Sequence, residues 1–321
     1  MGNFDLLKEI ALDTGQSKEV VIEIVRAAPY RYKVFDIPKK GRGFRTIAQP
    51  ARELKAVQRS IANLVLCKFP VHDCAMAYRQ GISISDNANI HAGSNPILKL
   101  DFEKFFNNIT ASAWVKFLRR QNHVSLSDKE IAFITFALFW GDGGLKPSCL
   151  SIGAPTSPLV SNIILFDFDS SMSAFASKNS VNYTRYADDI TVSSSSVSKL
   201  KLFEEYLRMF IKKNLVPRLI INEKKRALYS PAIRRMVTGL VLTPEGAVSL
   251  GRGRKREISS LIHRYTHNEL DNEKLAYLHG MLAFALSAEP EFVTRMRKKY
   301  GNDVVASILR YRVPRGFIEF I

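Results

Sequence analysis

Three aspartates in two short β-rich segments are the residues of this chain whose types and spacing best suit chemistry. Asp101 ends the apolar run 97–101, and Asp188 and Asp189 form an acidic pair within the alternating segment 182–194. Carboxylate oxygens are preferred ligands of Mg²⁺, and transfer of a nucleotide from its triphosphate uses two such cations. Acids at the ends of adjacent strands can converge, so the sequence predicts a two-metal centre for phosphoryl transfer.

The segment 182–194 must fold so that the acidic pair faces Asp101. Its alternation predicts a β-hairpin with Asp188 and Asp189 at the turn. Successive strand residues point to opposite faces, so one aspartate should be the main ligand and the other peripheral, unless the turn brings both round. We expect Asp188 to be the main ligand, although an acidic pair can also serve turn formation alone.

The remaining segments are expected to form a mixed α+β fold whose antiparallel sheet carries the acids. A second hairpin is predicted over 32–50, with lysines, arginines and glycines in its turn. Short strands are expected within 219–228 and 235–250, and a glycine-rich loop over 141–150. Helical spacing of apolar residues occurs over 4–28, 52–69, 111–140 (two helices), 155–178, 199–214 and from about 255 onwards.

Composition indicates a folded protein with a polyanionic partner. Of 321 residues, 46% are hydrophobic and 24% are charged, which excludes wholesale disorder. Lys and Arg number 47 against 30 Asp and Glu, a formal net charge of +17. Residues 201–321 hold 23 basic and 12 acidic residues, so most of the surplus lies there. Such a surplus favours nucleic acid over an anionic membrane as the partner.

Cysteine use and hydropathy favour a reducing location. Cys67, Cys74 and Cys149 form no CxxC pair, and the first ten residues lack the pattern of a signal peptide. The longest apolar run, 131–140, is too short to span a bilayer and is expected to be a buried helix. We therefore expect a cytoplasmic protein without a membrane partner.

Three motifs together resemble those of reverse transcriptases. Residues 186–189, YADD, resemble the YxDD tetrad; residues 98–106, LKLDFEKFF, resemble the first palm motif; and residues 153–158, GAPTSP, resemble the second. The resemblance spans about residues 30–250 and implies a right-hand polymerase fold and RNA-directed DNA polymerase activity with two Mg²⁺ ions. The implied division is an N-terminal helical extension (1–30), fingers (31–96, with part of 141–165), palm (97–245) and a basic, helical, RNA-binding thumb (246–321).

The resemblance also implies roles for individual residues. The metals would be bound by Asp101, the backbone of Phe102, Asp188 and Asp189. Lys225, or its neighbour Lys224, would protonate the leaving pyrophosphate. The incoming deoxynucleotide would be bound by Lys39, or its neighbour Lys40, and by Arg45, Phe102, Phe106 and Gly153. A glutamine that often precedes the motif glycine is here Ile152, which cannot hydrogen-bond, so no nucleotide contact is assigned to it.

Phe106 is expected to exclude ribonucleotides. In the family an aromatic residue at this place closes the sugar pocket, and a rigid ring where a 2′-OH would sit selects deoxynucleotides. Both Phe105 and Phe106 could instead belong to the core. We expect Phe105 to be a core residue and Phe106 to be the gate.

Two further motifs resemble those of retron reverse transcriptases. Residues 87–91, NANIH, fit an NAxxH pattern, and residues 237–239 form a VTG triplet. This implies a bacterial enzyme that binds a structured noncoding RNA (msr–msd), primes from the 2′-OH of an internal guanosine and makes branched multicopy single-stranded DNA (msDNA). It also implies dNTP substrates, a separate effector protein and a role in antiphage defence. The residues assigned to RNA or primer are Asn87, His91, Val237, Thr238, Gly239, Arg252, Arg254, Lys255 and Arg256.

Several alternatives stay open on sequence alone. The chain could be another bacterial reverse transcriptase, of the group II intron or diversity-generating type. It could also be an RNA-binding module with a decayed polymerase fold, although the intact aspartates argue against decay. Asn87 and His91 could simply order a loop. His263 and His267 lie one helical turn apart, but no third metal ligand is evident, so surface or RNA-facing histidines are favoured.

Overall fold

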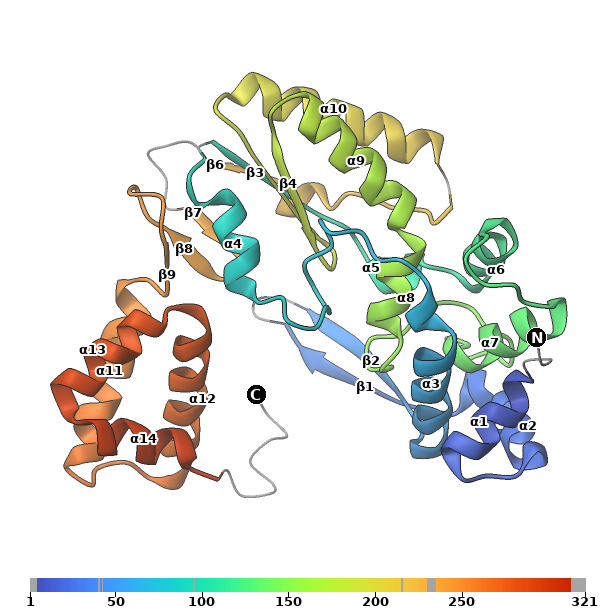
Figure 1. Cartoon of the computed structure of the whole chain (residues 1–321), viewed down its shortest axis with the longest axis horizontal. Helices are drawn as coiled ribbons and strands as arrows, with labels where there is room; N and C mark the ends of the chain where they lie inside the picture. The colour runs from blue at the N-terminus through green and yellow to red at the C-terminus, as the bar shows by residue number, and fades with distance from the viewer. Residues whose placement is uncertain are drawn as a thin grey trace.

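A central antiparallel sheet, flanking helices, a projecting hairpin and a C-terminal group of helices make up the chain (Figure 1). The computed structural model describes residues 5–39, 41, 43–94, 96–214, 216–229 and 235–312, so Lys40 lies outside the described residues. This mixed architecture confirms the predicted α+β class. The helices are α1 (Leu6–Thr14), α2 (Lys18–Ala27), α3 (Arg52–Leu64), α4 (Ile84–Ala92), α5 (Phe105–Asn108), α6 (Ala111–Arg120), α7 (Asp128–Leu138), α8 (Ser157–Ile164), α9 (Phe166–Lys178), α10 (Val197–Lys213), α11 (Arg252–Thr266), α12 (Asn272–Ala288), α13 (Pro290–Tyr300) and α14 (Asn302–Arg310), with 3-10 turns η1 (Ala28–Tyr30), η2 (Leu66–Lys68) and η3 (Glu223–Lys225). The strands are β1 (Tyr32–Pro38), β2 (Phe44–Pro50), β3 (Ile97–Asp101), β4 (Asn182–Tyr186), β5 (Asp189–Ser193), β6 (Ala227–Tyr229), β7 (Arg235–Val237), β8 (Leu240–Leu242) and β9 (Val248–Ser249).

The central sheet has the strand order β4-β5-β3-β6, and all its pairings are antiparallel. Its strands are rich in β-branched and aromatic residues, and most of their side chains are buried. Helices α9 and α10 cover one face of the sheet (Figure 1), where the ring of Phe203 packs 5.5 Å from that of Tyr183. The sheet therefore offers its strand ends, rather than its covered face, as a place for chemistry.

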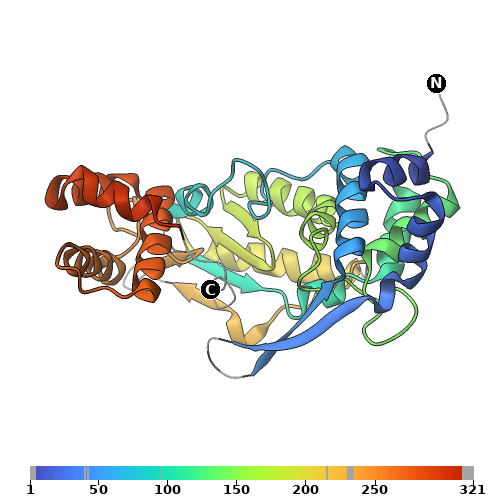
Figure 2. The ribbon, with the colours of Figure 1, turned by 90° about the horizontal axis from the view of Figure 1, so that it is seen from below.

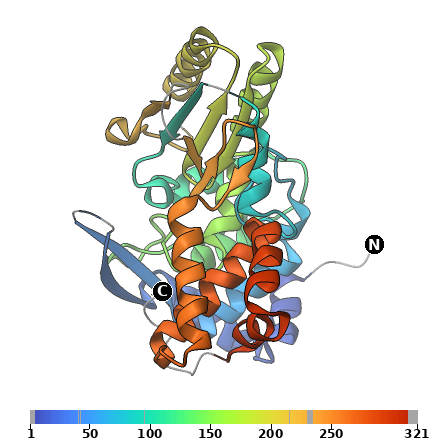
Figure 3. The same ribbon diagram turned by 90° about the vertical axis from the view of Figure 1, so that its left-hand side faces the viewer.

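The hairpin of β1 and β2 extends from the body of the molecule as a two-stranded arm (Figures 2 and 3). Every residue of β1 after Tyr32 is exposed, as are most residues of β2. At its base, Ala48 N donates to the carbonyl oxygen of Ile152 at 2.9 Å. The arm is thus anchored next to the glycine motif that follows Ile152, while its outer part is free to meet a ligand.

The C-terminal part has its own hydrophobic core, which is separate from the core of the sheet and the N-terminal helices. Buried side chains of α11, α12, α13 and α14 form it, together with residues of α4 and of the small sheet β7-β8-β9. Within the described part of the chain, no helix combines the length and apolar character needed to cross a membrane.

Several predicted elements differ from the structure in their bounds. The helical segment 4–28 is two helices, because Gly15 adopts a left-handed conformation (φ 66°) and Ser17 caps a new helix. The segment 155–178 is likewise divided at Leu165. The expected strand in 219–228 shrinks to β6, and helix α4 was not expected at all. Its capping box of Ser83 and Asp86 is the signal that could have found it.

Candidate active site

The strand register brings the predicted acids together. Asp101, the last residue of β3, lies directly opposite Asp189, the first residue of β5. Asp188 occupies the turn between β4 and β5, and its carbonyl oxygen accepts from Phe102 N at 3.0 Å. Asp101 is buried, whereas Asp188 and Asp189 are half-buried. Three carboxylates from two neighbouring strands therefore share one end of the sheet.

Burial, and to a lesser degree the neighbouring carboxylates, shift the ionisation of Asp188 and Asp189. Burial raises the pKa of Asp189 to about 6, with Lys99 opposing the rise and Asp188 and Asp101 adding to it. Burial, followed by the nearby Asp101, also raises the pKa of Asp188. Carboxylates that lie close together repel each other, and a hard divalent cation bound to them offsets that repulsion. The chemistry of these donors therefore fits Mg²⁺.

The acids do not form a closed metal cage. Within the described ranges, no three acidic, histidine or cysteine side chains are arranged as a ready metal site. Mg²⁺ usually takes only one or two protein carboxylates and completes its shell with water and phosphate oxygens. An open arrangement at the strand ends suits a cation whose remaining ligands come from a nucleotide.

A buried ion pair fixes the turn that carries Asp188. Arg185 and Asp169 are both fully buried, and Arg185 Nε donates to Asp169 Oδ1 at 2.8 Å. Arg185 Nη1 donates at 3.1 Å to the carbonyl oxygen of Ala187, which has a left-handed backbone (φ 58°). The same Nη1 donates to Asn162 Oδ1 at 3.1 Å. We did not identify Arg185, Asp169 or Asn162 from the sequence.

Lys225, rather than Lys224, reaches the acids. Its Nζ donates to Asp101 Oδ2 at 2.7 Å, and Asn222 Nδ2 lies 3.4 Å from Asp101 Oδ1. Partial burial lowers the pKa of Lys225, but the hydrogen bond to Asp101 and the nearby acids outweigh this and raise it overall. Lys225 is therefore a cation at neutral pH, placed beside the carboxylates.

The predicted nucleotide-binding residues differ in exposure and in their contacts. Arg45 in β2 is exposed and close enough to lower the pKa of Asp188, and Lys39 is exposed just beyond β1. Phe105 is buried, as expected for a core residue, and Phe106 is half-buried. The Phe102 side chain does not fit the nucleotide contact predicted for it, because it is 2% exposed and stacks on Phe105 with ring centroids 6.0 Å apart.

Gly153 allows the arm to approach the loop before α8 closely. Its φ of +119° is rarely adopted by residues with a side chain. A Cβ at this position would lie 3.0 Å from the carbonyl oxygen of Ala48 and 3.1 Å from Cγ2 of Ile47. Glycine is thus required here to seat β2, and this is a structural reason for the motif in addition to any contact with a nucleotide.

Direct RNA contact by Asn87 and His91 is not supported by the structure. Both residues are fully buried in α4. His91 Nδ1 lies 2.8 Å from Ser193 Oγ, and its Nε2 lies 2.8 Å from Thr184 Oγ1. Among the described residues, the amide of Asn87 has no hydrogen-bond partner. His91 joins α4 to β4 and β5, so the motif is structural in this conformation.

Acidification should destabilise the fold through His91. Burial lowers its pKa to about 3, from an ordinary value of 6.5. The neutral form is thus favoured by folding: its contribution is complete above about pH 6.5 and is lost as the pH falls towards 3. Between about pH 6 and 4, we expect His91 to lower the unfolding free energy by about 1.4 kcal/mol for each unit by which the pH falls. Urea unfolding at several pH values should show a shallower dependence for His91→Gln; equal slopes would contradict this assignment.

The VTG triplet is a turn that links α4 to α11. Val237 is fully buried, so its side chain cannot make the predicted primer contact. Thr238 and Gly239 both have positive φ, of 46° and 80°. Thr238 Oγ1 donates to the carbonyl oxygen of Ile84 at 3.1 Å, and the carbonyl oxygen of Gly239 accepts from Arg254 Nη1 at 2.7 Å. The triplet therefore positions the start of α11.

The basic cluster at the start of α11 divides into two kinds of residue. Arg254 is tied to Gly239, and Lys255 Nζ lies 2.6 Å from Glu289 Oε1. Arg252 and Arg256 are exposed, and neither makes an ion pair within the parts of the chain described here. Arg252 and Arg256 are the two free to meet phosphates, whereas Arg254 and Lys255 also hold the helix in place.

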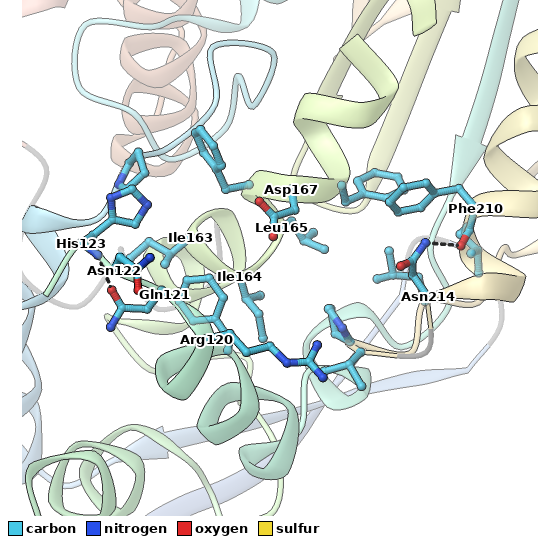
Figure 4. A pocket seen from close by; sticks show the side chains of 18 residues that line it. Arg120, Gln121, Asn122, His123, Ile163, Ile164, Leu165, Asp167, Phe210 and Asn214 are labelled. Carbon is cyan, nitrogen blue, oxygen red and sulfur yellow. Dashed lines mark hydrogen bonds between the residues drawn. The ribbon is translucent and has the colours of Figure 1, made fainter. Parts of the chain in front are cut away.

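A cavity of about 450 Å³ lies between the end of α6, the junction of α8 and α9, and the end of α10 (Figure 4). Arg120 and His123 line one side, and Asp167 and Asn214 come from other elements. None of the residues assigned above to metal, nucleotide or RNA lines it. The cavity is therefore separate from the acids at the strand ends.

The chain is similar to several known proteins. The model of the family described as reverse transcriptase (RNA-dependent DNA polymerase) matches residues 37–261. The chain is 40% identical over 282 residues to the retron Ec83 reverse transcriptase of Escherichia coli, covering 87% of this chain and 90% of that protein. It is 30% identical over 306 residues to the retron Ec86 reverse transcriptase of the same organism, covering 92% and 91%. A solved telomerase from Candida albicans, in complex with a TWJ fragment of telomeric RNA, is 14% identical with a TM-score of 0.48, covering 90% of this chain and 58% of that one.

Proposed function

We propose how this chain, which belongs to the reverse transcriptase family and is a retron reverse transcriptase, begins and sustains DNA synthesis. The polymerase activity itself follows from the family match and the retron relatives. Our proposal is that the enzyme binds a structured noncoding RNA, primes from the 2′-OH of an internal guanosine and copies part of that RNA into branched msDNA. The observation that carries the catalytic part is the register that sets Asp101 opposite Asp189, beside Asp188.

We assign the metal site to the oxygens at the ends of β3 and β5. Asp101, Asp188 and Asp189, with the backbone carbonyl of Phe102, would hold two Mg²⁺ ions. When bound, such ions activate the attacking hydroxyl and steady the leaving pyrophosphate. Arg185 keeps the turn of Asp188 in place, and the Phe102 N–H bond to the carbonyl of Asp188 ties that turn to β3.

We assign the triphosphate and its departing pyrophosphate to cations around the acids. Arg45 and Lys39 on the projecting arm would bind the phosphates, because fixed cations stabilise the charge that develops there. Lys225 holds its proton beside Asp101 and would donate it to the pyrophosphate. Residues 31–96 with part of 141–165 would then act as fingers, 97–245 as palm and 246–321 as thumb, after the helical extension 1–30.

We assign RNA binding chiefly to the C-terminal helices. Their exposed Arg252 and Arg256 would bind phosphates, which positions RNA without reading its sequence. Binding should weaken steeply as salt rises, because each phosphate contact releases counterions. As the retron resemblance implies, the proposal also includes a separate effector protein and a role in antiphage defence in the bacterial cytoplasm.

Phe106→Ala should admit ribonucleotides. The Phe106 ring is half-buried and packs 5.3 Å from that of Phe105, so the core holds it in place five residues after Asp101. We expect discrimination between dCTP and CTP, measured as the ratio of kcat/KM values on one primer–template, to fall at least about tenfold. Phe175→Ala removes another half-buried ring, which lies in α9 and stacks on Tyr206 of α10, and should leave the ratio unchanged. Equal ratios for wild type and Phe106→Ala would refute the gate.

Priming chemistry is the direct test of the retron proposal. Wild-type protein is incubated with Mg²⁺, labelled dNTPs and the structured RNA encoded beside it, either intact or with its 3′-terminal ribose oxidised by periodate. We expect labelled DNA that stays joined to RNA in both cases and is released by a 2′–5′ debranching enzyme. DNA synthesis that stops after periodate treatment would show 3′-end priming and overturn the proposal.

A further inference from the structure

A short segment before α4 runs beside the strand that leads to the catalytic turn. Ala75 pairs with Arg185 in a parallel bridge, outside the named strands. Arg185 N donates to the carbonyl oxygen of Cys74, and Met76 N donates to that of Arg185, both at 2.8 Å. Residues 74–77 are all buried. This segment is therefore built into the sheet next to β4 and ends level with the YADD turn.

Tyr78 leaves this buried segment abruptly. It is 51% exposed, directly after four buried residues, and its φ of 63° is in the left-handed region. A non-glycine residue in that conformation is strained, and such strain persists where the surrounding structure enforces it, often at functional sites. Asn162 Nδ2 enforces it here by donating to the carbonyl oxygen of Ala77 at 2.9 Å.

One buried network fixes both Tyr78 and the catalytic turn. The amide of Asn162 holds Ala77 with its nitrogen and accepts from Arg185 Nη1 with its oxygen. The same Nη1 holds the carbonyl oxygen of Ala187, the residue before Asp188. A single guanidinium group thus sets the position of the exposed tyrosine relative to the acids.

Tyr78 lies near enough to both the acids and the arm to be influenced by their charges. Burial raises the pKa of its hydroxyl, Asp188 and Tyr186 raise it further, and Arg45 lowers it. The next residue, Arg79, turns away, because its Nη2 lies 3.0 Å from Asp73 Oδ1. Tyr78 therefore presents an aromatic surface at the site, with no neighbouring charge from its own loop.

We propose that the Tyr78 ring packs against the terminal base pair of the primer–template duplex and so positions the primer end over the aspartates. The inference rests on the proposed site at Asp101, Asp188 and Asp189. An exposed ring offers stacking to any base and needs no sequence readout, as a polymerase requires. The ring, rather than the hydroxyl, makes the contact. Tyr78 is a positioning residue, because it takes no part in the transfer itself.

Binding of a fluorescent duplex tests this without requiring turnover. A DNA primer is annealed to an RNA template with 2-aminopurine in the terminal base pair, or five pairs upstream as a control. With wild type and Tyr78→Phe we expect quenching of the terminal probe on binding, and with Tyr78→Ala we expect its loss and a roughly tenfold weaker duplex Kd. Tyr30→Ala, which removes a tyrosine of similar exposure (56%) from the N-terminal region, should behave as wild type.

The outcomes separate this inference from the proposed catalysis. Tyr78 is half-exposed, so Tyr78→Ala should unfold at the same urea concentration as wild type. Terminal quenching and Kd unchanged in Tyr78→Ala would overturn the inference, as would a Tyr78→Phe variant as defective as Tyr78→Ala. Failure of the proposed catalysis would instead appear as wild-type protein that binds the duplex and quenches the probe but extends no primer.

Discussion

Asp188→Asn should abolish primer extension, with a loss of at least about 1000-fold in rate. Its carboxylate lies in the turn that faces Asp101, and asparagine keeps the shape but removes the charge that a metal ion needs. Single-turnover extension of an RNA-templated primer in Mg²⁺ measures the loss. Burial and the neighbouring Asp101 raise the pKa of Asp188, so its charge opposes folding. Unfolding free energy should therefore stay equal to wild type or rise.

Glu103, an acid close to Asp101 in the sequence, provides a matched control for Asp188→Asn. Glu103 is exposed, lies two residues after Asp101 and is not among the predicted ligands. Glu103→Gln makes the same change of charge close to the site, and we expect activity within about twofold of wild type. If Asp188→Asn kept more than a tenth of wild-type activity, the assignment of Asp188 as a metal ligand would be wrong.

Arg185→Met should have the largest effect on stability, about 3–5 kcal/mol lost from the unfolding free energy. The substitution leaves Asp169 fully buried and without the guanidinium that satisfies it. It also releases the carbonyl oxygen of Ala187 and the amide of Asn162, so extension by the folded fraction should fall as well. Urea unfolding measured in parallel with extension separates the two effects.

The exposed ion pair of Arg119 with Asp128 is the control for this prediction. Its side chains are 61% and 81% exposed, and Arg119→Met should cost less than about 1 kcal/mol. Adding Asp169→Leu to Arg185→Met should recover part of the lost stability, because no unpaired buried charge remains. If Arg185→Met cost no more than Arg119→Met, the buried pair would not hold the turn.

Patterns of short range were sufficient to predict the strands that carry the three aspartates. The alternation in 182–194 and the acid at the end of 97–101 predicted two strand ends that meet, and the register of Asp101 with Asp189 confirms this. The hairpin over 32–50 was likewise predicted at its observed bounds. These elements depend on an alternation of side chains with a period of two residues and on the residue types of turns. Both can be recognised within a short stretch of sequence.

Side-chain partners from distant elements could not be predicted in this way. Arg185 lies in a strand and Asp169 in a helix, and no local spacing in the sequence indicates that they are paired. His91 was expected to contact RNA because it lies in the NAxxH motif. The motif does not show which face of its helix is buried, since that depends on tertiary packing. The capping box at Ser83 would have shown the helix that carries His91, though not its orientation.

The basic surplus near the C-terminus also needed the structure for its interpretation. From the sequence, all the basic residues of the cluster at 252–256 were expected to be available to RNA. The structure engages Arg254 with Gly239 and Lys255 with Glu289, which leaves Arg252 and Arg256 exposed. Net charge favours a polyanionic partner, but the division between structural and binding cations depends on contacts that only the fold creates.

Binding of Mn²⁺ at the strand ends tests the central claim most directly. Electron paramagnetic resonance can count the Mn²⁺ ions held by the protein with a primer–template and a non-hydrolysable dNTP analogue. We expect about two per wild-type complex, fewer in Asp101→Asn and Asp188→Asn, and no change in Glu103→Gln. Equal Mn²⁺ occupancy in wild type, Asp101→Asn and Asp188→Asn would contradict the assignment of the metal site to these carboxylates.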